Sequence, residues 1–228
     1  MKLTQEIEAV DLALKYKDYL IIADLHLGLE EALNKQGILI PKFQFQEILE
    51  KLEKIIKEVK PKAIIINGDL KHEFGLISEQ EWSQVFKLLE FLTKKSKVIL
   101  IKGNHDTILE PIAKKFNIKI LEKLEIDNIT VLHGNKILPI KTKILIIAHE
   151  HPAISISNKI RSELYKCFLK GSYKNKTLIV QPSFNLVNIG SNILKEKILS
   201  PYINNIENFE AFVVSDKIYD FGKISTLK

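Results

Sequence analysis

Asp24 and His26 stand two residues apart, directly after the apolar run at residues 20–23. In a β-strand, residues two apart point to the same side, so this pair shares a face wherever the extended geometry persists. A carboxylate and an imidazole are ligands that Mn, Fe and Zn ions take in proteins. The spacing therefore predicts half of one metal ion's coordination shell at the end of a strand.

Polar residues of the same kinds follow the other apolar runs of the chain. Open parallel sheets bind ligands just beyond the carboxyl ends of their strands, so residues that follow separate strands converge on one crevice. His149 and His151 repeat the two-residue spacing of the first pair. The polar residues in such positions are Asp24, His26, Asp69, Asn104, His105, Asp106, His133, His149 and His151. Their types and positions predict a metal centre assembled from several strand ends.

Short β-branched runs mark the strands that must position these residues, because each run is too short for a buried helix. The segments between the first runs carry apolar residues three and four apart, which predicts helices. The expected strands are 19–24, 63–69, 97–104 and 143–150, and the expected helices are 43–60, 79–95 and 107–116. This alternation predicts parallel strands joined by right-handed crossovers.

After residue 120, hairpins replace the alternation. Short strands flank an expected turn at Asp127-Asn128 and another at Ser215-Asp216. No internal repeat and no linker rich in Pro, Gly or Ser divides the sequence. We therefore expect a single α/β domain over residues 1–228, arranged as a four-layer α/β/β/α sandwich with mixed sheets.

The composition is that of a globular chain, with 228 residues, 46% hydrophobic content and a net charge of +6. This mild basicity is compatible with an anionic partner but does not require one. The single cysteine, Cys167, excludes an internal disulfide and suits a reducing cytoplasm. Neither a signal peptide nor an apolar run of the ~18 residues expected of a membrane span is found, so we expect a cytoplasmic protein without a membrane partner.

The order Asp-x-His, Gly-Asp, Gly-Asn-His-Asp, His, His-x-His resembles the calcineurin-like metallophosphoesterase superfamily across residues 20–152. The stretches HLGLEEAL, GDLKHEFG and AHEHPA are similar to an archaeal subgroup related to the SbcD nuclease subunit. They are also similar to a bacterial phosphoesterase encoded beside DNA ligase and helicase genes. This finer resemblance extends to IRSELYKCFLKG and QPSFN, and it implies the sandwich fold. Full SbcD-type nucleases carry a further capping region, but 228 residues leave no space for a substantial one, so we expect no separate capping domain.

The resemblance implies a site for two divalent metal ions, with Mn favoured and Fe or Zn as alternatives. It implies that Asp24, His26 and His151 hold one ion, that Asn104, His133 and His149 hold the other, and that Asp69 bridges them. Mixed imidazole, carboxylate and amide ligands suit such ions at a separation of about 3.5–4 Å. His105 resembles the catalytic histidine of the family. Asp106 either orients that imidazole or caps the following helix.

The expected activity is that of a binuclear metal-dependent phosphodiesterase, in which a hydroxide bridging the ions attacks phosphorus. The nuclease relatives favour DNA or RNA as substrate, in repair or processing, with a helicase or ligase as a partner. Two alternatives stay open: a small-molecule phosphodiesterase or phosphomonoesterase acting, for example, on cyclic nucleotides, and a non-catalytic interaction module on the same fold. Steep salt dependence would favour the nucleic-acid substrate.

Two further residues are candidates for substrate binding. His72 follows Asp69 by three residues and either touches substrate or faces solvent in a loop. Arg161 is the only arginine of the chain, and its guanidinium suits phosphate capture. It lies in the basic segment 158–177, where Tyr165, Phe168 and Tyr173 are interleaved. That segment is either a nucleic-acid track or an ordinary lysine-rich surface whose aromatic side chains turn inward.

Overall fold

The computed structural model describes residues 1–41, 43–75, 77–157 and 161–227. A first sheet carries the beginning of the chain. In sheet order its described strands are β1 (Ile7–Val10), β2 (Ala13–Tyr16), β3 (Tyr19–Ile22), β4 (Ala63–Asn67), β5 (Lys97–Ile101) and β6 (Ile120–Leu121). β3 to β6 pair in parallel, whereas β1 to β3 are antiparallel. The expected parallel strands are confirmed, but each ends two or three residues earlier than expected.

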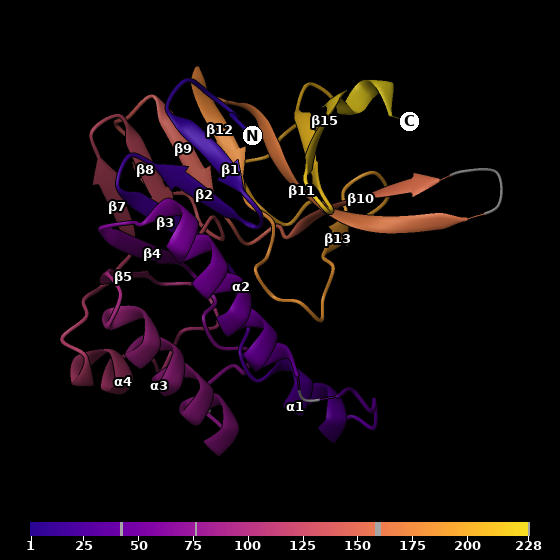
Figure 1. Cartoon of the computed structure of the whole chain (residues 1–228). Helices are drawn as coiled ribbons and strands as arrows, with labels where there is room; N and C mark the ends of the chain where they lie inside the picture. Colours follow the sequence, from indigo (N-terminus) through magenta and orange to yellow (C-terminus); the bar gives the residue numbers. More distant parts are fainter. Residues whose placement is uncertain (42, 76, 158–160, 228) are drawn as a thin grey trace.

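Helices cover the outer face of this sheet, on the lower side of Figure 1. They are α1 (Leu29–Lys35), α2 (Gln44–Val59), α3 (Glu79–Thr93) and α4 (Glu110–Lys115). The three expected helices are confirmed, with α4 shorter than expected, and α1 was not expected. α3 begins with a complete capping box between Ser78 and Glu81. No described helix has both the length and the apolar character needed to cross a bilayer.

The second sheet is also mixed. Its described strands are β7 (Lys123–Ile126), β8 (Ile129–Leu132), β9 (Ile144–Ile147), β10 (Pro152–Ser157), β11 (Ser162–Tyr173), β12 (Lys176–Val180), β13 (Ser191–Asn192), β14 (Glu210–Val214) and β15 (Ile218–Lys223). β8, β9 and β12 are parallel neighbours. The expected hairpins β7–β8 and β14–β15 are confirmed. The long β10–β11 hairpin, which was not expected, projects from the body in Figure 1.

Period-two alternation along β9 shows how the layers are made. Ile144 and Ile146 belong to the core between the two sheets, whereas Leu145 and Ile147 belong to a core on the far side of the second sheet. That far side is covered by residues 193–209 and by the 3-10 helix η1 (Ile224–Thr226), which contributes Ile224. The outermost layer of the described chain is therefore mainly irregular, in place of the expected α-helical layer.

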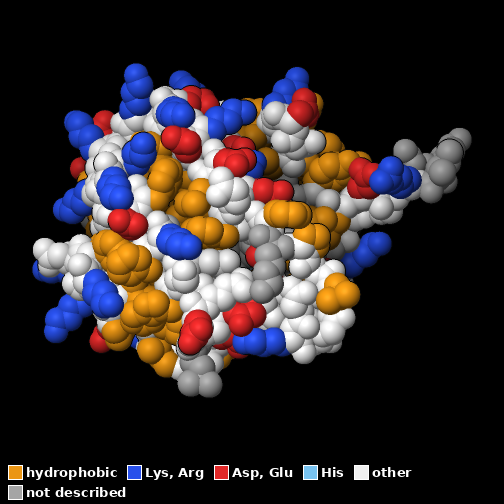
Figure 2. All heavy atoms as spheres, turned by 60° about the horizontal axis from the view of Figure 1, so that its bottom comes forward, with side chains coloured by type: hydrophobic (Ala, Val, Ile, Leu, Met, Phe, Trp, Pro, Cys, Tyr) orange, Lys and Arg blue, Asp and Glu red, His pale blue; other side chains and the backbone are white. Residues whose placement is uncertain are grey.

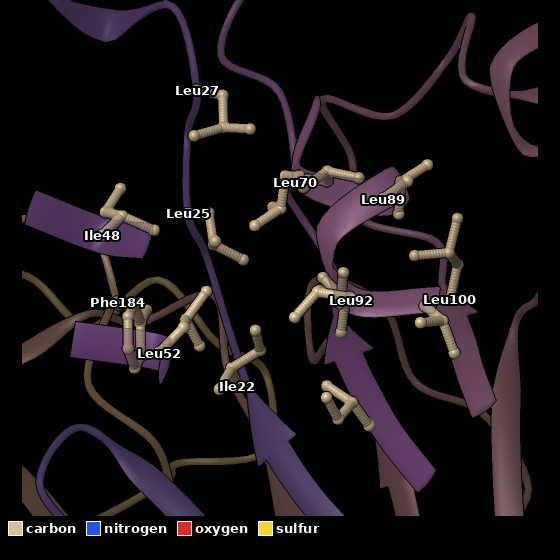
Figure 3. Close-up of a cluster of buried hydrophobic side chains, with 14 of the residues drawn as sticks. Ile22, Leu25, Leu27, Ile48, Leu52, Leu70, Leu89, Leu92, Leu100 and Phe184 are labelled. Carbon is tan, nitrogen blue, oxygen red and sulfur yellow. The ribbon is translucent and has the colours of Figure 1, made fainter. Parts of the chain in front are cut away.

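The core beneath α2 and α3 reaches the loops that follow β3 and β4. Figure 3 shows Leu25, Leu27 and Leu70 directed into the same cluster as side chains of the helices and strands. All three are essentially inaccessible to solvent. They are sequence neighbours of Asp24, His26 and Asp69, so the apolar residues fix the backbone whose polar residues form the site.

Candidate metal centre

Asp24 and His26, the first predicted pair of ligands, do not lie in a β-strand. β3 ends at Ile22, and Asp24 and His26 have φ angles of 51° and 45°, in the left-handed region. The extended geometry, on which the shared face of this pair was conditional, therefore does not persist to His26. The intervening Leu25 is buried in the core instead, which leaves both polar side chains on the opposite side. Such backbone angles cost about 1–3 kcal/mol each and concentrate at functional sites. Asp69, His149 and His151 adopt the same region.

One group of ligand atoms is formed by Asp24, His26, Asp69 and His151, whose ligand atoms all lie within 4.8 Å of one another. Nε2 of His26 is 3.3 Å from Nε2 of His151. Nε2 of His151 is 3.2 Å from Oδ2 of Asp24, and Nε2 of His26 is 3.7 Å from Oδ2 of Asp69. These residues come from the loops after β3, β4 and β9, so three strand ends converge as expected.

A second group is formed by Asp69, His133 and His149. Nε2 of His133 lies 3.3 Å from Oδ2 of Asp69 and 2.9 Å from Oδ1 of Asn104. The rings of His133 and His149 meet edge to face at a centroid distance of 5.0 Å. Asp69 therefore belongs to both groups, and its Oδ2 faces an imidazole of each. This is the geometry required of a carboxylate that bridges two cations.

The donor set fits two divalent cations. The two Nε2 atoms of His26 and His151 face each other at 3.3 Å, although two neutral imidazoles gain little from such a contact unless a cation or a shared proton lies between them. Oδ1 of Asp24 is buried and has no hydrogen-bond partner among the described residues. Imidazole nitrogens with carboxylate and amide oxygens suit Mn, Fe or Zn. The individual ligand roles stay predictions.

The protonation of the histidines also favours metal binding. Burial, together with the neighbouring imidazoles, lowers the pKa of His26 to about 3 and that of His149 to about 4. Both rings are therefore neutral at pH 7 and can donate a lone pair. Burial also opposes the charge of His133, but Asp69 and Asp24 outweigh it and raise its pKa to about 9. A cation that binds at His133 must displace this proton.

His105 lies beside the shared aspartate. Its Nδ1 donates to the backbone carbonyl of His72, which can only accept, so this hydrogen bond fixes the tautomer and the ring orientation. Its Nε2 then faces the cluster, 3.9 Å from Oδ2 of Asp69. The backbone N–H of His105 donates to Oδ1 of Asp69 at 2.9 Å. His105 is thus placed to contact a group bound at the metal centre, as the catalytic role requires.

The model of the calcineurin-like phosphoesterase family matches residues 18–181, which include every member of the two clusters. The chain belongs to this family. It is accordingly a metal-dependent phosphoesterase, with no separate capping domain in the described residues. No curated protein matches it in sequence.

Two solved structures show similarity to this phosphoesterase. Nuclease MPE of Pseudomonas putida is 19% identical, covers 92% of each chain and superposes with a TM-score of 0.68. YfcE, a phosphoesterase from E. coli, is 13% identical, covers 90% of this chain and 97% of its own, and gives a TM-score of 0.46. The first likeness supports the fold, and the second is too distant to support an argument.

His72 joins the other histidines of the phosphoesterase site. Its ring lies 5.6 Å from that of His26 and 5.7 Å from that of His105, between centroids. The structure therefore places His72 at the cluster rather than in a remote loop. Its contact with substrate stays a prediction.

The loop of His72 is held by Glu81, which sequence reasoning missed. This buried carboxylate accepts from the backbone N–H groups of His72 and Glu73, at 3.0 and 2.8 Å, and from that of Ser78 at 3.2 Å. It also packs against Gly28, where an added Cβ would lie 2.1 Å from Cγ of Glu81. The Ser-x-x-Glu capping box was the available signal, because it marks the start of a helix. Its reach to the site could not be deduced from that spacing.

Asp106 takes neither of its expected roles. Its carboxylate accepts from the backbone N–H groups of Gly103 and Leu70, at 2.9 and 3.0 Å, and so ties the loop after β5 to the loop after β4. The imidazole of His105 is oriented by His72 instead, and α4 has Leu109 at its N-cap. Burial, with the nearby charge of Asp69, raises the pKa of Asp106 to about 6. Short-range spacing could not reveal this link between two loops.

Arg161 is not part of the metal centre. It lies at the outer end of the β10–β11 hairpin, about 20 Å of strand beyond His151, and its guanidinium pairs with Glu163 at 2.7 Å. In the same basic segment, Phe168 and Tyr173 are buried in the cores, whereas Tyr165 is partly exposed. Residues 158–160 lie outside the described residues. Phe168 and Tyr173 therefore turn inward, as expected of an ordinary lysine-rich surface and not of a nucleic-acid track.

The loop after β12 supports the first metal group. Ser183 donates to the carbonyl of Asp24 at 2.8 Å, and Asn185 donates to that of Leu25 at 2.9 Å. Lys166 on β11 in turn donates to the carbonyls of Ser183 and Asn188, at 3.0 and 2.7 Å. Burial lowers the pKa of this lysine to about 7. A partly buried lysine therefore holds the loop that fixes Asp24.

Proposed function

We propose that this protein is a binuclear metal-dependent phosphodiesterase that cleaves nucleic acid. The observation that carries the proposal is the position of Asp69 Oδ2, which faces His26 at 3.7 Å, His133 at 3.3 Å and the Nε2 of His105 at 3.9 Å. A shared carboxylate with a free imidazole nitrogen beside it suits in-line displacement at phosphorus.

Two bound ions would polarise the phosphoryl oxygens and activate water for attack. The protein supplies the rest of the chemistry. Asp24, His26 and His151 would hold one cation, and Asn104, His133 and His149 would hold the other. His105, fixed through Nδ1, presents Nε2 to the phosphoryl group or the leaving oxygen. Because Nδ1–H is donated to His72, Nε2 carries a proton, and acts as hydrogen-bond donor or general acid, only when the ring is an imidazolium.

Three observations support a nucleic-acid substrate. The net charge of +6 favours polyanions. The described chain has no separate cap over the site that would restrict access to small esters. The structural neighbour that supports the fold is itself named a nuclease. On the face shown in Figure 2, however, lysine side chains lie mainly around the edge and are mixed with acidic ones. We propose short single-stranded segments rather than duplex ends as substrate, because the described chain has no capping region.

A small-molecule phosphodiesterase, for example one acting on cyclic nucleotides, is the second candidate. The inward orientation of Phe168 and Tyr173 favours it, because it removes two aromatic rings from the expected nucleic-acid track. Arg161, at the far end of a hairpin, also makes no contribution at the centre.

The finer parts of the proposal rest on the sequence resemblance. We infer Mn²⁺ as the working metal and a role in DNA repair or processing in the cytoplasm. The likeness to the archaeal SbcD-related subgroup and to the ligase-associated phosphoesterase suggests a helicase or ligase as partner. The whole chain, residues 1–228, is taken to act as one domain.

The test is turnover of single-stranded DNA, single-stranded RNA, duplex DNA and a cyclic nucleotide with Mn²⁺, using His105→Ala as the inactive control. We expect the single strands to be cleaved, with kcat/KM falling steeply between about 50 and 200 mM salt because several phosphates are bound. Efficient turnover of the cyclic nucleotide alone, with little salt dependence, would establish the second candidate instead.

A further inference from the structure

Phe74 is an exposed aromatic residue at the edge of the metal centre. Its side chain is 61% exposed, although a phenyl ring in water forgoes the free energy that burial would give. No step of the proposed chemistry uses it. Exposed aromatic rings beside a phosphate site are the usual platforms for nucleobases in single-strand binding proteins.

The ring is held in place on a structured loop. Its centroid lies 3.7 Å from that of His105, with the ring planes inclined by 35°. The preceding residue, Glu73, donates its backbone N–H to Glu81, and the following residue, Gly75, donates to Oγ1 of Thr107 at 3.3 Å. Phe74 is therefore anchored on both sides, and ordering it on binding costs little conformational entropy.

Phe74 lies one side chain away from the metal cluster. Phe74 contacts His105, and Nε2 of His105 lies 3.9 Å from Oδ2 of the shared Asp69, so a single imidazole ring separates the phenyl group from the cluster. A phosphodiester bound at the cluster carries its sugar and base away from phosphorus on either side.

We propose that Phe74 is a specificity-determining residue that stacks on the nucleobase next to the scissile phosphate. This rests on the proposed function and narrows it to phosphodiesters that carry a base. The stack is tolerant of base identity, because each base has a π-face. Phe74 takes no part in proton transfer, so its contribution is to binding and alignment of the nucleotide.

The experiment compares two substrates that share one leaving group. Thymidine 5′-(p-nitrophenyl phosphate) carries a base, and methyl p-nitrophenyl phosphate carries none. Wild-type protein should prefer the thymidine ester, and Phe74→Ala should lower the kcat/KM ratio of thymidine ester to methyl ester at least about fivefold, mainly through KM. Phe74→Trp should keep or raise this ratio. Phe74→Leu, whose side chain is apolar but not planar, should lower it as Phe74→Ala does. Tyr219→Ala, an exposed aromatic on β15, is the matched control and should leave the ratio as in wild type.

The outcomes separate the two proposals. If wild-type protein with Mn²⁺ hydrolyses neither ester, the proposed function fails. If it hydrolyses both and Phe74→Ala lowers both equally, Phe74 merely supports His105, and the stacking proposal is overturned. If Phe74→Leu keeps the kcat/KM ratio of the two esters as well as Phe74→Trp does, the stacking proposal is also overturned, because an apolar contact would then be enough.

Discussion

Nδ1 of His105 donates to the backbone carbonyl of His72, while Nε2 of the same ring faces Asp69 Oδ2 at 3.9 Å. One hydrogen bond thus decides which nitrogen faces the substrate. The carbonyl that accepts it belongs to a loop held by Glu81, so the orientation of the proposed catalytic group depends on a carboxylate outside the metal centre.

We expect His105→Ala to retain both metal ions and to lose activity. The side chain belongs to neither of the two groups that share Asp69, and the third possible group, His26, His72 and His105, has no carboxylate, so we expect the metal content to stay as in wild type. Loss of a positioned acid or hydrogen-bond donor lowers kcat by about 10² to 10⁴. Metal content by elemental analysis and turnover of bis-p-nitrophenyl phosphate measure the two effects. Wild-type turnover by the variant would show that the role is misassigned.

Asp69→Asn should deplete both metal sites, because one side chain serves both groups. An amide in place of the carboxylate removes a negative charge and offers one ligand oxygen instead of two. Elemental analysis after dialysis should show less than one ion per chain, compared with about two in wild type. Asn104→Ala is the comparison, since its amide faces His133 alone in the second group. If Asp69→Asn lost only one ion, Asp69 would not be the bridge.

Glu81→Gln should disturb the loop that carries His72. The buried carboxylate accepts three backbone N–H groups, and the amide nitrogen of glutamine cannot accept, so one donor loses its partner at a cost of about 1–3 kcal/mol. We expect a lower free energy of unfolding in urea and a lower kcat with unchanged metal content. Glu79→Gln, exposed in the same first turn of α3, is the control and should alter neither. A stability loss without any change in kcat would separate the loop from catalysis.

Lys166 should give the protein a distinctive dependence of stability on pH. Burial lowers its pKa to about 7 in the folded protein, below the ordinary value of 10.5. Between these values the unfolded chain binds more protons, so the contribution of Lys166 to the free energy of unfolding rises with pH, by at most about 1.4 kcal/mol per pH unit. Lys166→Met removes this contribution. Urea unfolding of both proteins at pH 7 and pH 9 gives the free energy of unfolding of wild type minus that of Lys166→Met. This difference should be larger at pH 9 than at pH 7. An equal difference at the two pH values would contradict the pKa assignment.

The sequence predicted β3, β4 and β5 of the first sheet and the polar residues that follow them, because hydrophobic period and polar strand ends are local properties. β4 is an example: the apolar run at 63–66 identifies the strand, and Asp69 after it identifies the chemistry. The β1–β2 and β10–β11 hairpins were missed, since their strands lack so clear a run. The irregular outer layer was missed as well, because residues 193–209 form no regular element and pack on the second sheet through scattered apolar residues.

By itself, the sequence determined which side chains could bind metal and the order in which strand ends supply them. Residue types and the alternation of apolar strands with helices can be read from the sequence directly. Only the tertiary structure decided that Asp69 faces both histidine groups, that Glu81 and Lys166 hold the loops, and that Phe74 lies against His105. These relationships join residues that are separated in the sequence, such as Asp69 and His133 or Lys166 and Ser183. They depend on how loops pack over a folded core, where left-handed backbone and buried hydrogen bonds override local propensity.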